Sequence, residues 1–396
     1  MNTINDISLK GKRVLIRVDF NLPLDDELNI TDDGRMLAAL PTIKRVISDG
    51  GMAIVMSHLG RPQNGFEKKF SLKNPANHLS TLLSSPVSFS SNCIGGKTEL
   101  DVKKMNPGDV LVLENLRFYK EETAGDESFA KKLAALGDIY INDAFGAAHR
   151  SHASTAIIAK FFPKKKYFGL LLAKEIAFLE QAIINTNRPF TAIIGGAKIT
   201  GKIDVITALF DKVDNLIIGG GMGYTFAKAM GGEIGRSLVE KEKVFLAKKL
   251  IAKAKEKNVN LLLPTDSLNS MSLRDFSNIN TSSILSIDKS YIGLDIGRES
   301  IDKFVNIITS SKTIIWNGPM GVFEIKQFEN GTKEIAKAIC LATKKGSFSL
   351  VGGGDSVASL KKFNLENEVS YISTGGGAML EYLEGKKLPG ISAIMD

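Results

Sequence analysis

The chain has 396 residues, of which 43% are hydrophobic and 24% charged, and its formal net charge is +8. One hydrophobic core rarely serves more than about 250–300 residues, so two or three domains are expected. Two distant cysteines, Cys93 and Cys340, exclude a disulfide-stapled scaffold. The first residues lack the pattern of a signal peptide, and no apolar run approaches the ~18 residues of a membrane helix, so a cytoplasmic protein is expected.

The first half of the chain alternates between predicted strands and predicted helices. Short runs rich in Ile, Val and Leu predict strands at residues 13–20, 52–58, 87–90, 110–114 and 139–142. Helical periodicity predicts helices at residues 36–48 and 129–136. Near-continuous apolar strands are typical of parallel sheets covered on both faces, so the pattern indicates an α/β fold.

Polar and cationic side chains follow four of these strands. They are Asp19, Asn21, His58, Arg61, Arg117 and Arg150, and Arg35 at the start of a helix could join them. Ligands of open α/β sheets bind beyond the carboxyl ends of the strands, and arginine binds carboxylate and phosphate oxygens bidentately. Any one such arginine is more often in a surface salt bridge, but their recurrence predicts a site for a small polyanion. The histidines have no metal-ligand spacing.

A predicted helix at residues 171–184 separates this half from a second α/β unit. The segment NTNRP ends the helix, and strands are predicted at residues 191–194, 215–218, 260–263, 313–316 and 347–351. We therefore place a first lobe at 1–170, a connecting helix or hinge at 171–189 and a second lobe at 190–382. Residues 383–396 contain Pro and Gly and are interpreted as a tail that packs back on the first lobe.

The segment FTAIIGGAKITGKI, residues 190–203, combines a strand, a glycine turn and two lysines. If a helix follows the turn, Lys198 and Lys202 lie on one face near its start, where free N–H groups favour an anion. Residues 196–202 spell G-x-x-x-x-G-K, but Ile203 stands where a P-loop needs Ser or Thr for Mg²⁺. The segment predicts a phosphate site that is not a P-loop.

Glycine triplets follow other strands of the second half, at residues 219–221, 352–354 and 375–377. Asp355 follows the second triplet and is either a Mg²⁺ ligand near phosphates, a helix N-cap, or both. The third triplet precedes a helix whose N-terminus could face a phosphoryl group. Glu324 could accept a hydrogen bond from a ribose hydroxyl. Together with the lysines, these clusters predict nucleotide binding.

An arginine-rich lobe and a glycine-rich lobe together indicate a phosphotransferase that closes to react, because phosphoryl transfer needs mainly positioning and charge neutralisation. One alternative is a different two-lobed ATP-dependent carboxylate kinase. Another is a nucleic-acid-binding protein, which the net charge of +8 would suit. The arginines are scattered one to a strand end and aromatic residues make up only 7%, so nucleic acid is not expected as a partner.

Long motifs in fixed order cover nearly the whole chain: RVDFN, ALPTIK, SHLGRP, LENLRF, YINDAFGAAHR, GGAK, GGGM, IGRSLVE, WNGP followed by GVFE, GGGDS and STGGGAMLEYLEG. By these motifs the chain resembles the phosphoglycerate kinases. The resemblance implies reversible transfer of a phosphoryl group from 1,3-bisphosphoglycerate to ADP, giving 3-phosphoglycerate and ATP in glycolysis. It implies two Rossmann-like three-layer α/β/α lobes with mainly parallel sheets, joined by a helix and separated by a cleft. It also implies a monomer, with Mg²⁺ carried by ATP or ADP.

The resemblance assigns roles to individual residues. Phosphoglycerate would be bound by Arg17, Asp19, Phe20, Asn21, Arg35, His58, Leu59, Gly60, Arg61, Arg117 and Arg150. The nucleotide would be bound by Gly195, Gly196, Ala197, Lys202, Gly219, Gly220, Gly293, Asn317, Pro319, Glu324, Gly353, Gly354, Asp355 and Ser356. Asp355 would hold Mg²⁺, and Arg35, Lys198 and Gly376 would be catalytic. No membrane partner is expected.

Four positions depart from the usual family pattern. Gly201 replaces a frequent Asp, and Ser356 stands where Thr is usual. Arg298 stands where Pro is typical, and Tyr371 where His is often found. The last two bear on how the lobes close and leave the expected activity unchanged.

Overall fold

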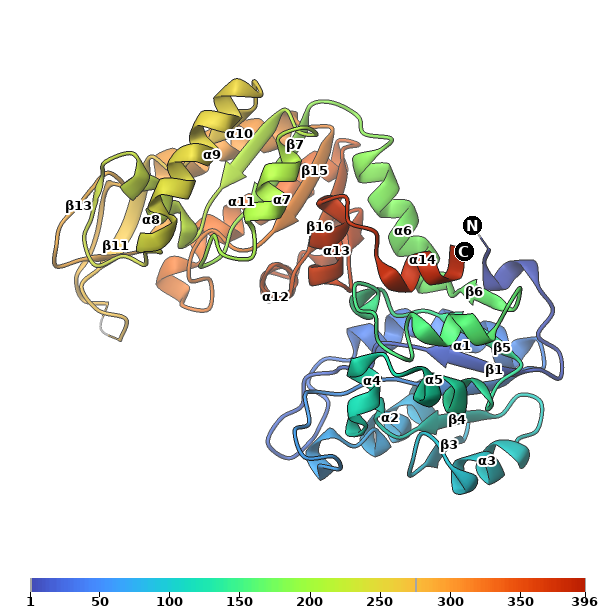
Figure 1. The fold of residues 1–396 in the computed structure, drawn as a ribbon. Coiled ribbons are helices and arrows are strands. Elements are labelled where there is room, and N and C mark those ends of the chain that lie inside the picture. The colour runs from blue at the N-terminus through green and yellow to red at the C-terminus, as the bar shows by residue number, and fades with distance from the viewer. Residues whose placement is uncertain (1, 275, 396) are drawn as a thin grey trace. The chain divides into compact units, whose positions relative to one another are not determined.

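The computed structural model describes residues 2–274 and 276–395, which form two compact units (Figure 1). Unit 1 contains the described residues up to Ala177 together with residues 387–395, and unit 2 contains those of Phe178–Lys386. The division falls inside helix α6 (Leu170–Ile183), within the range 171–189 that we interpret as the connection. None of the helices in the described part of the chain is long and apolar enough to span a membrane.

A six-stranded sheet forms the centre of unit 1. All its neighbouring strands are parallel, and their order is β3-β4-β2-β1-β5-β6. The strands are β1 (Arg13–Arg17), β2 (Met52–Met56), β3 (Val87–Ser90), β4 (Val110–Leu113), β5 (Ile139–Asn142) and β6 (Lys166–Phe168). The predicted parallel α/β architecture is therefore confirmed for this unit.

Both faces of this sheet are buried, which explains why its strands are almost continuously apolar. On one face, Val14 and Ile16 of β1 join the core formed with Ile43 and Val46 of helix α1. Leu15 and Arg17 of β1 point to the opposite face and are also fully buried. The helices of unit 1, besides α6, are α1 (Gly34–Ser48), α2 (Lys73–Leu83), α3 (Gly96–Lys103), α4 (Lys120–Ala124), α5 (Glu127–Ala134) and α14 (Pro389–Met395).

Unit 2 has a second six-stranded parallel sheet, ordered β10-β8-β7-β15-β16-β17. Its strands are β7 (Phe190–Ile194), β8 (Asn215–Ile218), β10 (Asn260–Leu262), β15 (Thr313–Asn317), β16 (Phe348–Gly352) and β17 (Tyr371–Ile372). Two small sheets accompany it: antiparallel β12 (Ile279–Ser283), β11 (Asp266–Ser270) and β14 (Ile292–Ile296), and parallel β13 (Ser286–Ile287) with β9 (Glu233–Ile234).

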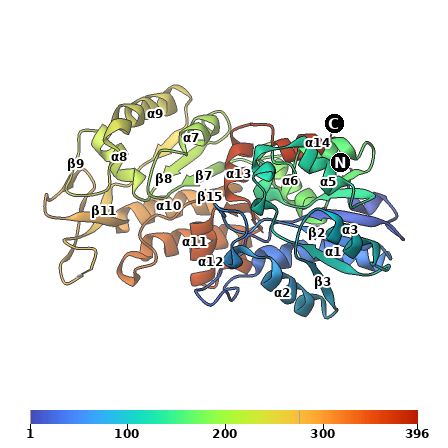
Figure 2. The ribbon, with the colours of Figure 1, turned by 60° about the horizontal axis from the view of Figure 1, so that its bottom comes forward.

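Helices cover both faces of the large sheet in unit 2 as well. Figure 2 shows α10, α11 and α12 on one side and α7, α8 and α9 on the other. The first group packs on Ile193, Ile314 and Trp316 of the sheet. The helices are α7 (Ile203–Leu209), α8 (Met222–Ala229), α9 (Val244–Glu256), α10 (Arg298–Ser310), α11 (Asn330–Lys344), α12 (Gly354–Lys362) and α13 (Gly376–Leu383).

Several predicted strands are shorter in the structure. The first ends at Arg17 instead of residue 20, and the second at Met56 instead of residue 58. The residues beyond these points take part in hydrogen bonds between loops, such as that from the Phe20 amide to Ser57 Oγ at 2.8 Å. The small sheets with β9 and β11 to β14 were missed, because their strands carry many polar residues and have no long apolar run.

The C-terminal segment, which we interpret as a tail and not as a further helix-strand unit, contains one short helix. Pro389–Met395 forms helix α14, and its residues Ile391 and Ile394 are buried. The Gly390 amide donates to the Ala148 carbonyl at 2.8 Å, and Asn142 Nδ2 donates to the Gly390 carbonyl at 3.0 Å. This short helix is thus part of unit 1, held at the end of strand β5.

Helix α6 is fixed at each end by a contact within one unit. In unit 1, the Leu172 amide donates to Asp143 Oδ1 at 3.1 Å, and the Leu170 amide donates to Thr42 Oγ1 at 2.9 Å. In unit 2, the Phe178 ring stacks on Tyr371 with centroids 4.3 Å apart. The unusual Tyr371 therefore packs directly against the helix that joins the units. Arg298 is exposed and pairs with Asp302 one turn along α10.

Candidate functional site

The polar residues that follow the strands of unit 1 are brought together by the sheet order. Strands β4, β2, β1 and β5 lie side by side and parallel, so the loops after them meet at one edge. Gly60 joins three of these loops, because its amide donates to Asn21 Oδ1 at 2.8 Å and its carbonyl accepts from Arg117 Nη1 at 2.8 Å. Arg35 Nη1 donates to the Asn21 carbonyl at 2.9 Å and lies 3.5 Å from Asp19 Oδ2.

His58 lies at the centre of this cluster and is almost fully buried. Burial, followed by the charges of Arg17, Arg117 and Arg35, holds the pKa of His58 well below its usual value. Arg17 Nη2 lies 3.2 Å from His58 Nδ1. Because a guanidinium can only donate, His58 Nδ1 accepts, and the proton of the neutral ring is on Nε2. The side chain is therefore a neutral hydrogen-bond donor.

Arg17 lies beneath this surface, with its side chain fully buried. Its Nε donates to Ser154 Oγ at 2.8 Å, and Ser154 Oγ donates to Glu122 Oε1 at 2.6 Å. Burial raises the pKa of Glu122, and the charge of Arg17 opposes that rise. Sequence reasoning missed Glu122 and Ser154, which lie far from Arg17 in the chain and in no recognisable pattern. They hold Arg17 in place from below.

The remaining predicted residues of unit 1 differ in accessibility. Arg61 and Arg150 are exposed. Burial and then the charge of Arg17 lower the pKa of Arg117, and the charge of Arg61 lowers it further. Burial and the charge of Arg17 likewise lower the pKa of His152, and the charge of Arg150 lowers it further. The side chains of Phe20 and Leu59, in contrast, belong to the hydrophobic core. These two residues can meet a ligand only through their backbone groups.

In unit 2, the loop after β7 closes on the loop after β15. The Gly196 amide donates to the Pro319 carbonyl at 2.9 Å, and the Lys202 ammonium donates to the Gly195 carbonyl. Gly318 has φ of 97°, and a Cβ added there would lie 2.4 Å from the Gly195 carbonyl oxygen, which Lys202 Nζ contacts. Bare backbone is thus required beside this ammonium. Burial, opposed by the charge of Asp355, lowers the pKa of Lys202 to about 8.

The condition that a helix directly follows the glycine turn and carries both lysines is not met. Helix α7 begins only at Ile203, so Lys198 and Lys202 belong to an irregular loop that precedes it. Lys198 is exposed, whereas Lys202 is half-buried. The two ammonium groups therefore reach the site from a loop and not from one face of a helix.

A third group of residues adjoins this loop from β15, β16 and α13. Asn317 Nδ2 donates to the Gly352 carbonyl at 3.0 Å, and the Gly318 amide donates to Ser356 Oγ at 2.6 Å. A Cβ added to Gly376 would lie 2.8 Å from the Gly353 Cα. The start of α13 therefore meets the start of α12 at the strand ends.

The acidic candidates in unit 2 are exposed. Asp355 lies in the first turn of α12, whose N-cap is Gly353, so Asp355 is not the cap. Glu324 lies in the loop between β15 and α11. Among the residues that the structure describes, no group of three or more His, Cys, Asp or Glu side chains is arranged to hold a metal. A single open carboxylate still suits Mg²⁺ that is held mainly by phosphates.

The other predicted glycines lie further along the same unit. The Gly220 amide donates to the Met320 carbonyl at 3.1 Å, which joins the loop after β8 to the loop after β15. Gly219 lies against the Met320 side chain, and Gly354 is exposed at the start of α12. Gly293 is on β14 of the small antiparallel sheet, where its missing side chain leaves room for Tyr224 of α8.

One residue of this site was missed by sequence reasoning. Glu240, which is buried, accepts hydrogen bonds from the Ile199 amide at 2.5 Å and the Thr200 amide at 3.3 Å. It therefore contacts the backbone between the two lysines. The motif IGRSLVE ends at this residue, but nothing in the sequence connects it to a loop some 40 residues earlier.

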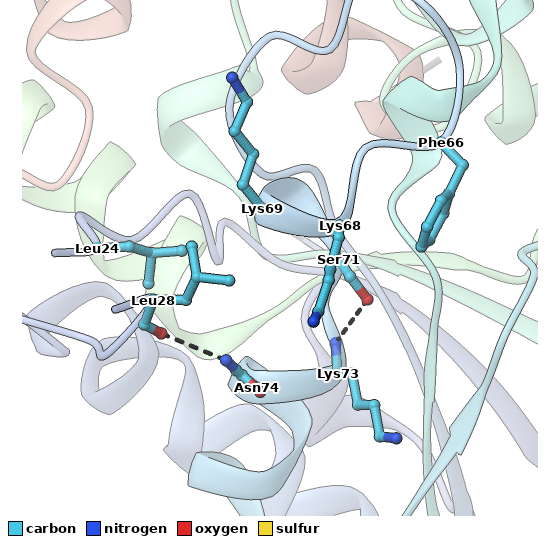
Figure 3. Close-up of a pocket in the computed structure, with 8 residues that line it drawn as sticks. All are labelled: Leu24, Leu28, Phe66, Lys68, Lys69, Ser71, Lys73 and Asn74. Atoms are coloured by element: carbon cyan, nitrogen blue, oxygen red, sulfur yellow. Dashed lines mark hydrogen bonds between the residues drawn. The ribbon is translucent and has the colours of Figure 1, made fainter. Parts of the chain in front are cut away.

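Two cavities lie apart from these residues. One, of about 310 Å³ in unit 1, is lined by Leu24, Leu28, Phe66, Lys68, Lys69, Ser71, Lys73 and Asn74 (Figure 3). The other, of about 660 Å³, lies in unit 2 between α9, β10 and α10. None of the predicted site residues lines either cavity.

Comparison with known proteins gives a consistent result. A family model described as Phosphoglycerate kinase matches residues 4–386. A phosphoglycerate kinase of Chlorobaculum tepidum is 51% identical over 394 residues, covering 100% of this chain and 99% of the relative. A phosphoglycerate kinase of Porphyromonas gingivalis is 49% identical over 416 residues, covering 99% of each chain.

Solved structures agree with the sequence relatives. The structure of phosphoglycerate kinase from Coxiella burnetii has a TM-score of 0.88 and 40% identity, and covers 99% of this chain and 98% of its own. That of phosphoglycerate kinase from Pyrococcus horikoshii has a TM-score of 0.84 and 30% identity, and covers 100% and 98% respectively. From the family model and these relatives, which extend over essentially the full length, the chain belongs to the phosphoglycerate kinase family.

Proposed function

We propose that this chain transfers a phosphoryl group between the acyl phosphate of 1,3-bisphosphoglycerate and ADP, with 3-phosphoglycerate and ATP as products. Membership of the family makes it a phosphotransferase with a carboxyl acceptor and gives it a glycolytic role. The observation that carries the residue assignments is the contrast between two strand-end clusters: arginines with a neutral histidine in unit 1, and two lysines with bare backbone in unit 2. We further propose a cytoplasmic monomer.

In unit 1, the proposed ligand is phosphoglycerate. Arg35, Arg61, Arg117 and Arg150 supply positive charge and paired donors that match phosphate and carboxylate oxygens. His58 adds a neutral donor through Nε2. Asp19 and Asn21 supply oxygen acceptors for a hydroxyl group, together with the backbone of Phe20, Leu59 and Gly60. The buried Arg17 acts through His58, which it holds in one tautomer.

In unit 2, the proposed ligand is the nucleotide. Lys202 binds its phosphates beside the backbone of Gly195, Gly196 and Ala197, while Gly219, Gly220, Gly293, Asn317, Pro319 and Gly353 shape the remaining surface. Ser356 holds the Gly318 amide and so supports this surface from behind. Glu324 accepts from a ribose hydroxyl. Asp355, beside Gly354, would hold Mg²⁺, which neutralises phosphate charge when bound with the nucleotide.

The proposed step breaks the bond between phosphorus and the carboxyl oxygen and forms a bond from phosphorus to an ADP oxygen. Both the attacking oxygen and the leaving carboxylate are ionised, so no side chain has to move a proton. Lys198, Arg35 and the Gly376 amide neutralise the charge on the transferring group, which is the main demand of this chemistry. Because these groups come from both units, we propose that the units close on the bound substrates.

The direct test is a coupled assay with 3-phosphoglycerate and MgATP, alongside glycerate and other small carboxylates. We expect turnover with 3-phosphoglycerate and far slower turnover with glycerate, because the arginines have no phosphate to bind. Binding of MgATP without transfer to 3-phosphoglycerate would show that the acceptor assignment is wrong. A solution scattering profile unchanged by both substrates together would contradict closure.

The pKa of Lys202 makes a separate prediction about protons. Its value of about 8 means that near this pH about half of the side chains have lost their proton. Bound phosphate stabilises the protonated form, so nucleotide binding near pH 8 should take up about half a proton, falling towards zero below about pH 7. Calorimetric titration of MgADP in buffers of different ionisation enthalpy measures this uptake. Lys202→Gln should abolish it, and equal heats in all buffers for the unchanged protein would refute the prediction.

A further inference from the structure

Glu240 is a buried acidic residue that lies directly behind the loop that carries the two lysines. Its carboxylate accepts from the amides of Ile199 and Thr200, at 2.5 and 3.3 Å from Oε2. These are the two residues that follow Lys198, and Lys202 comes two residues later. The carboxylate therefore fixes the part of the loop between the lysines.

The backbone of Glu240 is itself held in place. Its amide donates to Thr225 Oγ1 at 3.2 Å, and its carbonyl accepts from the Lys243 amide at 2.8 Å. Thr225 is buried on α8, the helix that follows the glycines after β8. Glu240 thus connects the lysine loop, through its carboxylate, to helix α8, through its backbone amide.

The loop has few other fixed points. Before the lysines, Gly196 accepts from the Met222 amide at 3.1 Å and donates to the Pro319 carbonyl at 2.9 Å. After Thr200, Gly201 adopts φ of 86°, and α7 begins at Ile203. The segment from Ala197 to Gly201 lies outside any helix or strand. The Ile199 side chain is fully buried and its carbonyl accepts from the Lys202 amide at 2.8 Å, and the Glu240 hydrogen bonds hold the amides of Ile199 and Thr200 at the same point.

The same contacts explain why the G-x-x-x-x-G-K segment differs from a P-loop. In a P-loop the backbone amides of the loop surround a phosphate. Here the amides of Ile199 and Thr200 are already occupied by an internal carboxylate. Burial raises the pKa of Glu240, but the hydrogen bonds from Thr200 and Ile199 and the charge of Lys198 outweigh burial and lower it. The carboxylate is therefore ionised, and these amides are closed to a second anion.

We propose that Glu240 is a positioning residue for phosphoryl transfer. It holds residues 198–202 so that both lysines present their ammonium groups to the phosphates, and it keeps the intervening amides from binding the phosphates themselves. This inference rests on the proposed roles of Lys198 and Lys202. Without Glu240, the freed amides can still bind nucleotide phosphate, but Lys198 is no longer fixed where charge develops during transfer.

The test compares Glu240→Ala, Glu240→Gln and the control Glu242→Ala in the 3-phosphoglycerate and MgATP assay. Glu242 is exposed and lies two residues further along the same segment. Displacing a catalytic group by a fraction of an ångström to 1 Å costs up to about 100-fold in rate, so we expect Glu240→Ala to lower kcat by about 10- to 100-fold. KM for MgATP should change by less than about threefold, since ground-state phosphate contacts remain.

Glu240→Gln separates positioning from folding, because its amide oxygen can still accept from Ile199. We expect Glu240→Gln to recover at least about a third of the kcat that is lost in Glu240→Ala, which would be a rescue by the conservative variant. Hydrogen exchange of a peptide covering residues 196–203 should speed up in Glu240→Ala and stay unchanged in Glu242→Ala. Where the alanine variant is too unstable for kinetics, the same exchange measurement is made on Glu240→Gln.

Three results would overturn the inference: a kcat of Glu240→Ala within about twofold of the unchanged protein, a loss confined to KM, or unchanged exchange in the loop. They are distinguishable from failure of the proposed function. If the unchanged protein does not phosphorylate 3-phosphoglycerate, the function is wrong. If the unchanged protein does phosphorylate 3-phosphoglycerate but Glu240→Ala behaves like the control Glu242→Ala, the proposed function stands and only the inference about Glu240 is wrong.

Discussion

Replacing Lys198 by alanine is expected to lower the rate of phosphoryl transfer by about 10²- to 10³-fold, the usual cost of removing one donor aimed at developing charge. The side chain is exposed, so its removal leaves the core and the fold unchanged. Binding of MgADP should change much less, because Lys202 and the glycine backbone remain in place. The loss should therefore appear in kcat and not in the affinity for nucleotide.

The measurement is the coupled assay combined with calorimetric titration of MgADP. Lys248→Ala is a matched control, since Lys248 is an exposed lysine of α9 in the same unit. Lys198→Arg keeps a positive charge on a side chain of different shape, so its rate should lie between the rates of Lys198→Ala and Lys248→Ala. A rate for Lys198→Ala within about tenfold of the rate of the control would contradict a catalytic role for Lys198.

The largest expected loss of stability comes from replacing Arg17 by methionine. Arg17 is fully buried and supplies the positive charge that opposes the raised pKa of Glu122. Arg17 reaches Glu122 through Ser154, and removing one member of a buried pair in direct contact costs about 3–5 kcal/mol, so we expect a loss near the lower end, about 3 kcal/mol. Urea unfolding should therefore show a loss of this order near neutral pH. The variant should also release His58 from its fixed tautomer.

A second variant and the pH dependence test the cause of that loss. Arg17→Met/Glu122→Gln should recover most of the stability, because no uncompensated charge remains. A buried carboxyl whose pKa is raised in the folded protein destabilises the fold increasingly as the pH rises from the pKa of the unfolded state to the pKa of the folded state. Without Arg17 the pKa of Glu122 in the folded protein rises further and this pH range widens. The loss of stability in Arg17→Met should therefore be smaller at acidic pH. An equal deficit at about pH 5 and pH 7, with no recovery in the double variant, would contradict this explanation.

The fold class was predictable because its signal is local. Each central strand is a short run rich in Val, Ile and Leu, and burial of both sheet faces makes such runs easy to recognise, as in β5 and β8. Polar residues just after these runs then share one edge by geometry alone. This is why Asp19, His58 and Arg117 could be grouped before their contacts were known.

What the sequence did not reveal depends on contacts between distant residues. A helix directly after Gly196 was one possibility, but the Ile199 and Thr200 amides bond to Glu240 and α7 starts later. Ser154 and Glu122 lie under Arg17 without any spacing that marks them. Buried polar partners of this kind satisfy hydrogen bonds inside the fold, and no local pattern requires them.

The position of α14 has a consequence for the order in which the protein matures on the ribosome. Residues 387–395 belong to unit 1 but are synthesised after all of unit 2. The edge of β5 with Asn142 and Ala148 therefore lacks its covering helix throughout translation of the second unit. Domains generally fold as they emerge, N-terminal first, but here the first to emerge is the last to be completed. A nascent chain stalled before residue 387 would thus contain all of the second unit and an incomplete first one.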